Sequence, residues 1–312
     1  MKKLPIENRS YKVLLEGYSQ WLDILGYAES TVYNLPNHAR EFLYYLEQNG
    51  HTELNSVTVQ IIKDYYVYLQ RRSNERRKGG GLSKSYLNKH QQGLKKFKEY
   101  LEKHGHTGFK VHLKTEVNPV EEKLNILTQA EIQELFTATN YSHTEDRFRL
   151  RDKALLVVFY SCGLRRTESV SLDIHDVYFE KGRLHVRKGK NYKKRYVPLN
   201  QKNLRILEDY LYESRPTFYN GKEEEALFLN TRGTRLGGMS FANRLHAIIK
   251  AAANKTIEEK GITLHSLRHS IATHLLQSGV PLSVIKTFLG HSSLESTQIY
   301  THLIKTIDHE SL

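Results

Sequence analysis

Three short segments in the second half of the chain carry side chains that could act together on a phosphate. In chain order these side chains are Arg165, His265, Arg268, His291 and Tyr300. Any one of them is ordinary, because the chain has 20 tyrosines and 16 histidines and such residues usually pack or lie on the surface. Together they have the required chemistry, since guanidinium groups bind phosphate oxygens as planar forks and a tyrosine hydroxyl can attack phosphorus. The combination therefore predicts a site that acts on a phosphodiester.

Arg165 directly follows a turn that ends a predicted apolar helix, residues 149–160. A guanidinium fixed against a buried helix end can present its fork to phosphate, whereas a surface arginine would only add charge. Glu168 lies three residues further on, within one helical turn. Its carboxylate either holds Arg165 in position or forms an ordinary i,i+3 ion pair. The sequence leaves both alternatives open.

His265 and Arg268 lie one helical turn apart at the start of a predicted helix. A helix N-terminus adds partial positive charge where an anion would bind. Residues 282–289 predict the next helix, with Pro281 at a first helical position. Gly290 ends that helix, so the segment with the later histidine and the tyrosine follows directly.

A basic hairpin is predicted between the first arginine and these helices. Residues 177–179, 184–186 and 195–198 predict three short strands, and the last two flank a tip formed by residues 187–194. Such a tip is usually exposed charge. On an enzyme that acts on DNA, it could instead enter the groove and bring a lysine ammonium to a leaving oxygen.

The net charge indicates the class of partner. With 47 Lys and Arg against 34 Asp and Glu, the formal charge is +13 and the pI is near 9.5. Such a surplus in a folded chain points to a polyanion, most often nucleic acid. An anionic membrane is the competing partner, but the sequence has no basic amphipathic helix with an isolated apolar face.

The single cysteine, Cys162, lies in an apolar run and is expected to be a small core residue. One cysteine argues against a zinc finger, and the motifs have no carboxylate cluster for a metal nuclease, so no metal or cofactor is expected. The start of the chain lacks the apolar region of a signal peptide, and no apolar run approaches the ~20 residues of a membrane span. We therefore expect an intracellular, cytoplasmic protein, associated with the nucleoid if it is bacterial.

The N-terminal third predicts four amphipathic helices. They cover residues 11–25, a segment from the N-cap Ser30 to residue 48, residues 58–72 and residues 83–104. Pro36 should kink the second helix or move its start. A basic, glycine-rich run joins the last two helices and could be a solvated loop or rest on phosphates. Candidate DNA contacts in the run, the fourth helix and the hairpin tip are Arg76, Arg77, Lys78, Lys84, Lys89 and Lys188.

The fold class is therefore mainly α with a small three-stranded antiparallel β-sheet. We expect a helical DNA-binding domain over residues 1–110, a linker over 111–125 where the periodicity breaks, and a catalytic domain over 126–312. The sequence Thr128-Gln129-Ala130-Glu131 has the pattern of a capping box at the start of that last domain. Helices are also expected over residues 203–213 and 240–253.

The motifs together resemble those of the tyrosine recombinases, also called phage-type integrases. They read Gly163-Leu164-Arg165 with Glu168, His265-x-x-Arg268-His269, Leu289-Gly290-His291, and Tyr300. The resemblance covers nearly the whole chain, because the N-terminal helices are similar to the family's SAM-like core-binding domain. The order and spacing are highly specific, although each motif alone is weak. The resemblance implies a two-domain architecture that clamps DNA.

The resemblance also implies a role for each motif residue. Arg165 and Arg268 would hold the scissile phosphate, His265 would relay the proton of the nucleophile Tyr300, and His291 would bond the phosphate. Lys190, or alternatively Lys188, would protonate the departing 5′-oxygen. The implied reaction is a metal-independent transesterification through a 3′-phosphotyrosine, for DNA integration, excision or resolution. The implied partner is double-stranded DNA with specific sites, bound by a homotetramer across two synapsed sites.

Some features depart from the family pattern or leave rival functions open. Pro36 interrupts the second helix, and Arg166 and Thr167 replace the usual aliphatic or small residue and serine. An arm-binding domain before Tyr11 is not expected. The rivals are a type IB topoisomerase-like relaxing enzyme and a non-catalytic, site-specific DNA-binding protein. Chromosome-dimer resolution, prophage integration and movement of a mobile element share the same chemistry.

Overall fold

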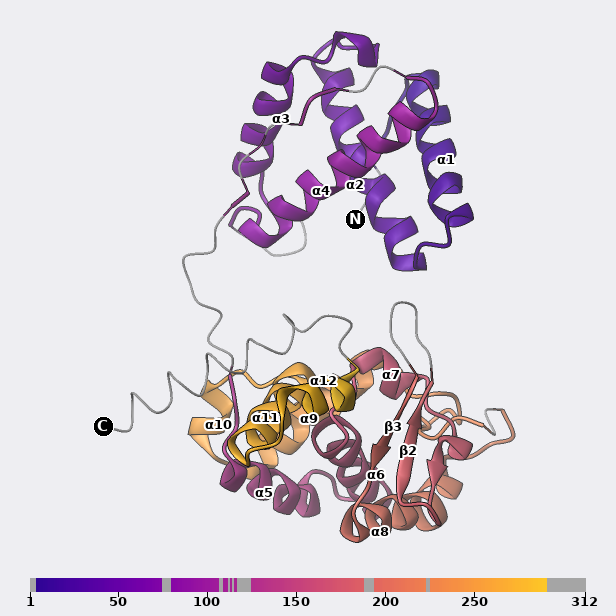
Figure 1. Cartoon of the computed structure of the whole chain (residues 1–312), viewed down its shortest axis with the longest axis vertical. Helices are drawn as coiled ribbons and strands as arrows, with labels where there is room; N and C mark the ends of the chain where they lie inside the picture. The colour runs from indigo at the N-terminus through magenta and orange to yellow at the C-terminus, as the bar shows by residue number, and fades with distance from the viewer. Residues whose placement is uncertain are drawn as a thin grey trace. The chain divides into compact units, whose positions relative to one another are not determined.

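The computed structural model describes the chain except for a few segments and the C-terminal end. These exceptions are residues 1–3, 75–79, 107–108, 112, 114, 117–124, 188–193, 223–224 and 291–312. The chain divides into two compact units, Met1–Glu122 and Lys123–Leu312 (Figure 1). No helix in the described part of the chain is both long and apolar enough to cross a membrane.

The first unit is helical. Its elements are α1 (Arg9–Ile24), α2 (Glu29–Gln48), the short 3-10 helix η1 (Leu54–Ser56), α3 (Val59–Arg71) and α4 (Lys84–Lys103). Side-chain caps begin three of these helices, because the side chains of Asn8, Thr58 and Ser83 each accept a hydrogen bond from a backbone N–H three residues later. The helices enclose an aromatic core that includes the fully buried Tyr18, Phe42, Tyr65 and Phe97.

Helix α2 differs from its prediction at its N-terminus. Ser30 is not the N-cap, because the helix begins at Glu29 and Ala28 occupies the capping position without a side-chain bond. The helix also does not start after Pro36 but continues through it. Proline removes one backbone hydrogen bond from a helix interior. The complete burial of Phe42 further along the helix offsets that loss.

The second unit packs many short helices and a small sheet around one apolar core. In chain order its elements are α5 (Gln129–Ala138), η2 (Thr139–Tyr141), α6 (Asp146–Leu156), η3 (Val157–Ser161), α7 (Arg166–Val170), η4 (Ile174–Asp176), β1 (Val177–Tyr178), β2 (Arg183–Val186), β3 (Arg195–Pro198), α8 (Gln201–Asp209), η5 (Tyr210–Ser214), η6 (Arg215–Phe218), α9 (Gly238–Ala252), α10 (Lys255–Glu259), α11 (Leu264–Gln277) and α12 (Leu282–Leu289). The predicted capping box at Thr128 and Glu131 is present at the start of α5.

The three strands form an antiparallel sheet in the order β1-β2-β3, which confirms the predicted fold class. Val177 pairs with Leu184, and Leu184 pairs with Val197. Successive strand residues point to opposite faces, so Val197 and Arg195 both face inward and are buried. The inward position of an arginine at the start of β3 becomes important at the site.

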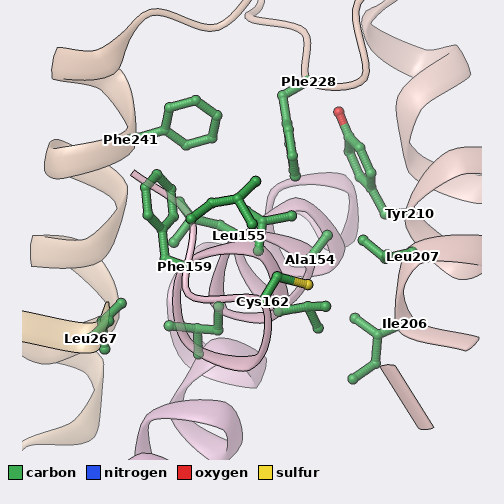
Figure 2. Packing of buried hydrophobic residues seen from close by; sticks show 14 of the residues in the cluster. Ala154, Leu155, Phe159, Cys162, Ile206, Leu207, Tyr210, Phe228, Phe241 and Leu267 are labelled. Carbon is green, nitrogen blue, oxygen red and sulfur yellow. The ribbon is translucent and has the colours of Figure 1, made fainter. Parts of the chain in front are cut away.

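The core of this unit surrounds the consecutive elements α6 and η3 (Figure 2). Phe159 meets Phe241 of α9 edge to face, with ring centroids 5.3 Å apart. Cys162 is fully buried, as predicted, and burial raises the pKa of its thiol to about 12. Gly163 then turns the chain with a φ of +60°, and a Cβ built on it would lie 3.0 Å from Leu289 and 3.2 Å from Phe288 of α12. This close approach brings the turn before Arg165 against the end of α12.

Helices α11 and α12 form a small second core, with Ala272, Ile285 and Leu289 buried together. Pro281 has a ψ of 141°, which is not helical, so it stands at the N-cap of α12 and not at the predicted first helical position. The helix begins at Leu282. Gly290 ends α12 with a φ of +67°. The helix therefore delivers its last carbonyl groups to the site described next.

Candidate active site

Arg165 is held by Glu168 at the start of α7. The backbone N–H of Arg165 donates to Oε2 of Glu168 at 2.8 Å, and Nη1 of the same arginine donates to Oε1 at 3.0 Å. Glu168 is only 6% exposed, so its carboxylate is a fixed internal group. Of the two alternatives left open by the sequence, the carboxylate that orients Arg165 agrees with this geometry, because it binds both ends of the residue.

Arg268 reaches the same place from α11. Thr263 caps that helix by accepting from the N–H of Ser266, which sets the first turn and places Arg268 one turn inside. Nη1 of Arg268 donates to the carbonyl of Gly163, and Nη2 donates to the carbonyl of Leu289 at 2.7 Å. The guanidinium is thus buried between the turn that precedes Arg165 and the end of α12.

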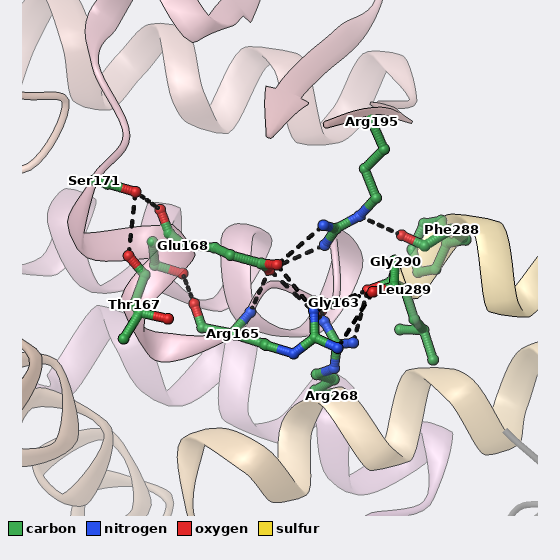
Figure 3. A network of polar contacts seen from close by, with 11 residues as sticks. Gly163, Arg165, Thr167, Glu168, Ser171, Arg195, Arg268, Phe288, Leu289 and Gly290 are labelled. Carbon is green, nitrogen blue, oxygen red and sulfur yellow. Dashed lines mark hydrogen bonds and ion pairs between the residues drawn. The ribbon is translucent and has the colours of Figure 1, made fainter. Parts of the chain in front are cut away.

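The two arginines converge (Figure 3). Nη1 of Arg165 also donates to the Leu289 carbonyl at 3.4 Å, and both of its terminal nitrogens donate to the carbonyl of Gly290 at 3.4 Å. Carbonyl oxygens at a helix C-terminus carry partial negative charge and accept hydrogen bonds, as phosphate oxygens do. The arrangement is therefore two guanidinium forks that meet at one small region, and their combined positive charge favours an anion bound beside them.

A third arginine, Arg195 of β3, also binds Glu168. Nη1 and Nη2 of Arg195 donate to Oε1 and Oε2 of Glu168 at 3.0 Å each, and Nε donates to the Phe288 carbonyl at 2.7 Å. The sequence reasoning missed this residue. The available signal was the strand alternation, which puts Arg195 on the same inward face as Val197.

His265 lies in the first turn of α11, with its side chain exposed near these arginines. Burial lowers the pKa of its imidazole, and the positive charges of Arg268, Arg166 and Arg165 lower it further. Burial, with His265 and Arg268, lowers the pKa of His269 to about 4. Both imidazoles are therefore held neutral near pH 7, and a neutral imidazole can accept a proton.

Other predicted site residues fall outside the described part of the chain. They are Arg76, Arg77, Lys78, Lys188, Lys190, His291 and Tyr300. Lys84 and Lys89 are described, and both lie exposed on α4 in the first unit. Within the described residues, no group of three or more His, Cys, Asp and Glu side chains is arranged to hold a metal ion.

Comparison with known proteins defines the class to which this fold and this site belong. The phage integrase family model matches residues 125–306, so the chain is a member of the phage integrase family. It is 30% identical over 296 residues to tyrosine recombinase XerD of Listeria monocytogenes serotype 4b (strain F2365), with 94% of each chain covered.

A second relative matches more strongly over a shorter region. Tyrosine recombinase XerD of Proteus mirabilis is 38% identical over 179 residues, which cover 57% of this chain and 54% of the relative. The chain thus spans about half the length of this relative. Among solved structures, XerH site-specific recombinase bound to difH substrate in a pre-cleavage complex has the same fold, with a TM-score of 0.72, 20% identity and 96% of each chain covered.

Proposed function

We propose that this chain is a site-specific DNA recombinase that cleaves and rejoins DNA strands by transesterification. The observation that carries the proposal is the convergence of Arg165, at the N-cap of α7, and Arg268 of α11 on the carbonyl of Leu289. Two fixed guanidinium groups on one spot suit the non-bridging oxygens of a phosphodiester whose charge grows during the reaction. Membership of the phage integrase family supports the same reaction class.

In the proposed step, the Tyr300 oxygen forms a bond to phosphorus while the bond from phosphorus to the 5′-oxygen breaks. An ordinary phenol has a pKa of ~10 and needs help to lose its proton. His265 takes that proton directly or through a relay, since its pKa is lowered and its imidazole is neutral. Lys190, with Lys188 as the alternative, protonates the departing 5′-oxygen, and His291 hydrogen-bonds the phosphate. The 3′-phosphotyrosine retains the bond energy for rejoining without a cofactor.

The remaining parts of the proposal concern DNA binding and assembly. Residues 1–110 act as the core-binding domain and residues 126–312 as the catalytic domain, joined by residues 111–125. Exposed Lys84 and Lys89 of α4 and the basic run Arg76-Arg77-Lys78 neutralise DNA phosphates. The partner is double-stranded DNA with specific sites, and four copies act on two synapsed sites. The reaction takes place in the cytoplasm and serves integration, excision or resolution, including that of a mobile element.

A covalent trapping experiment tests the proposed reaction. The full chain first selects duplexes from a random-sequence library, and the selected site is then nicked beside the cleavage position so that the released strand diffuses away. The wild-type chain should accumulate a DNA adduct in chelator, whereas Tyr300→Phe should not. An adduct at the wild-type level in Tyr300→Phe would show that Tyr300 is not the nucleophile. Mixing two marked sites should yield exchanged strands, and relaxation without exchange would indicate a topoisomerase.

A further inference from the structure

The carboxylate of Glu168 lies among three arginines in the described part of the site, and its acceptor positions are all used. Oε1 accepts from Nη1 of Arg165 and Nη1 of Arg195. Oε2 accepts from the backbone N–H of Arg165 and Nη2 of Arg195. A carboxylate offers about four acceptor positions, so these four bonds saturate it. The carboxylate therefore has little capacity to bind a further donor.

This saturation affects Arg268. Its Nη1 lies 3.8 Å from Oε2 of Glu168, which is beyond hydrogen-bond distance, and its terminal nitrogens donate instead to the carbonyls of Gly163 and Leu289. An arginine close to a carboxylate with vacant acceptor positions would be drawn into a bidentate pair with it. Arg195 fills two of those positions, and so keeps Glu168 from competing for the guanidinium of Arg268.

The charges lead to the same conclusion. Burial alone would raise the pKa of Glu168. The hydrogen bonds and charge of Arg195, with smaller contributions from the backbone N–H of Arg165 and the charge of Arg268, together lower it, so the carboxylate is ionised. Three guanidinium groups around one carboxylate leave positive charge in excess. Without Arg195, one buried negative charge would face the two arginines that are proposed to bind phosphate, and their attraction for an anion would fall.

Arg195 also contacts the end of α12. Its Nε donates to the Phe288 carbonyl, and a Cβ built on Gly290 would lie 2.7 Å from its Nη1. Arg195 thus connects strand β3 to Glu168 on one side and to the end of α12 on the other. The side chain itself is buried, with 5% exposure, so it is a part of the supporting structure and not a group that would meet DNA.

We infer that Arg195 is a positioning residue for strand cleavage. It occupies and neutralises Glu168, so that this carboxylate does not offset the positive charge of Arg165 and Arg268 and both side chains stay oriented toward the scissile phosphate. The inference rests on the proposed recombinase function. It predicts a loss of the cleavage rate with duplex binding largely kept, because the guanidinium groups would remain in the protein but point away from the phosphate.

The decisive test replaces Arg195 alone and together with Glu168, the carboxylate that it binds. Adduct formation is followed in single turnover at saturating protein, on the nicked site described above, and duplex affinity and thermal unfolding are measured for every variant. Arg195→Gln should slow adduct formation roughly tenfold to a hundredfold, the scale expected when reacting groups are misplaced. Adding Glu168→Gln to that variant should restore part of the rate, because no unpaired carboxylate then competes for Arg165 and Arg268.

A purely structural role would give a different pattern. In that case the double variant would be no faster than Arg195→Gln, and this result would overturn the inference, as would a wild-type rate in Arg195→Gln. Arg244→Gln is the matched control, since Arg244 also pairs with a buried carboxylate, that of Asp152, but away from the site. It should lower the unfolding temperature without slowing adduct formation by folded protein.

Two further comparisons keep the test conclusive. If Arg195→Gln does not fold, Arg195→Lys takes its place, because lysine keeps the charge but cannot bind both carboxylate oxygens as a fork. It is compared with Arg195→Lys combined with Glu168→Gln, and restoration is again expected. If the wild-type chain itself forms no adduct, the proposed function fails. If the wild-type chain forms the adduct and the Arg195 variants form it at the same rate, the positioning role fails and the proposed function stands.

Discussion

Arg165 and Arg268 share one hydrogen-bond acceptor, the carbonyl oxygen of Leu289, at 3.4 and 2.7 Å. The two arginines come from segments that are far apart in the sequence, one before α7 and the other within α11. Because both guanidinium groups reach the same carbonyl, they lie close enough together for a phosphate bound beside them to receive donors from both. We therefore expect the two side chains to bind one phosphate together.

Loss of either arginine should slow cleavage far more than it weakens DNA binding. Arg165→Ala and Arg268→Ala each remove donors to the transition state, and one lost oxyanion donor costs about 3–4 kcal/mol. Single-turnover adduct formation at saturating protein measures the first effect, and a duplex titration measures the second. Arg149→Ala serves as the control, because Arg149 pairs with Asp146 on the surface. Equal losses of cleavage rate and duplex affinity would show that the two arginines contribute to DNA binding alone.

Gly290→Ala should impair the site beyond its effect on stability. The substitution puts a Cβ against Nη1 of Arg195 and also forces a side chain into a φ of +67°. Gly279→Ala is a matched control at the end of α11, where φ is +77° and nothing lies within 4 Å of an added Cβ. Both variants should lose about 1–2 kcal/mol of unfolding free energy. Only Gly290→Ala should also slow adduct formation, and equal rates would show that the contact with Arg195 is unimportant.

Much of this arrangement could be predicted from local patterns. Apolar spacing and a turn predicted the helix that ends before Arg165, the pattern around His265 predicted the start of the helix that carries Arg268, and three short strand segments predicted the antiparallel sheet. The family resemblance predicted that the two arginines would act on one phosphate, and their shared acceptor agrees with this. These features follow from residues that are neighbours in the sequence or from motifs with fixed order.

Arg195 and Pro36 show what local patterns could not supply. The role of Arg195 depends on two contacts with distant segments, Glu168 of α7 and Phe288 of α12, and no spacing rule connects them. At Pro36, local propensity predicted a kink or a later start of the helix, and burial of the apolar side chains of α2 in the core keeps the helix continuous through the proline. In both cases tertiary contacts decided the outcome.

Ala253 is strained at the end of α9, and relieving the strain should stabilise the chain. It is the non-glycine residue with positive φ in the described part of the chain, at +51°. Ala253→Gly should raise the unfolding free energy by up to about 1 kcal/mol, because glycine has no Cβ to crowd the carbonyl in this conformation. Ala252→Gly, one residue earlier in the helix, should instead lower it by about 0.5–1 kcal/mol. Denaturant titration of both variants measures the change in unfolding free energy. A change of the same sign in both variants would show that Ala253 is not strained.

The first unit should lose stability as the pH falls below the ordinary histidine range. His38 and His90 lie in its interior, with ring centroids 4.3 Å apart. Burial, then the charge of Lys89, lowers the pKa of His38 to about 4, and burial, then His38 and Arg72, lowers the pKa of His90 to about 2. Between pH 6.5, the ordinary value, and pH 4, the unfolded chain therefore binds more protons than the folded one.

The expected loss is up to about 1.4 kcal/mol per pH unit for each histidine over that range, with no dependence from this pair above pH 7. The single tryptophan, Trp21, lies in α1 of this unit, so its emission follows unfolding of the unit within the full chain. Urea titrations at several pH values give the slope of stability against pH. His38→Gln removes one of the two titrating groups and should reduce that slope by about half, by the same linkage. A stability that stays constant from pH 7 to pH 5 would show that these histidines are protonated in the folded unit.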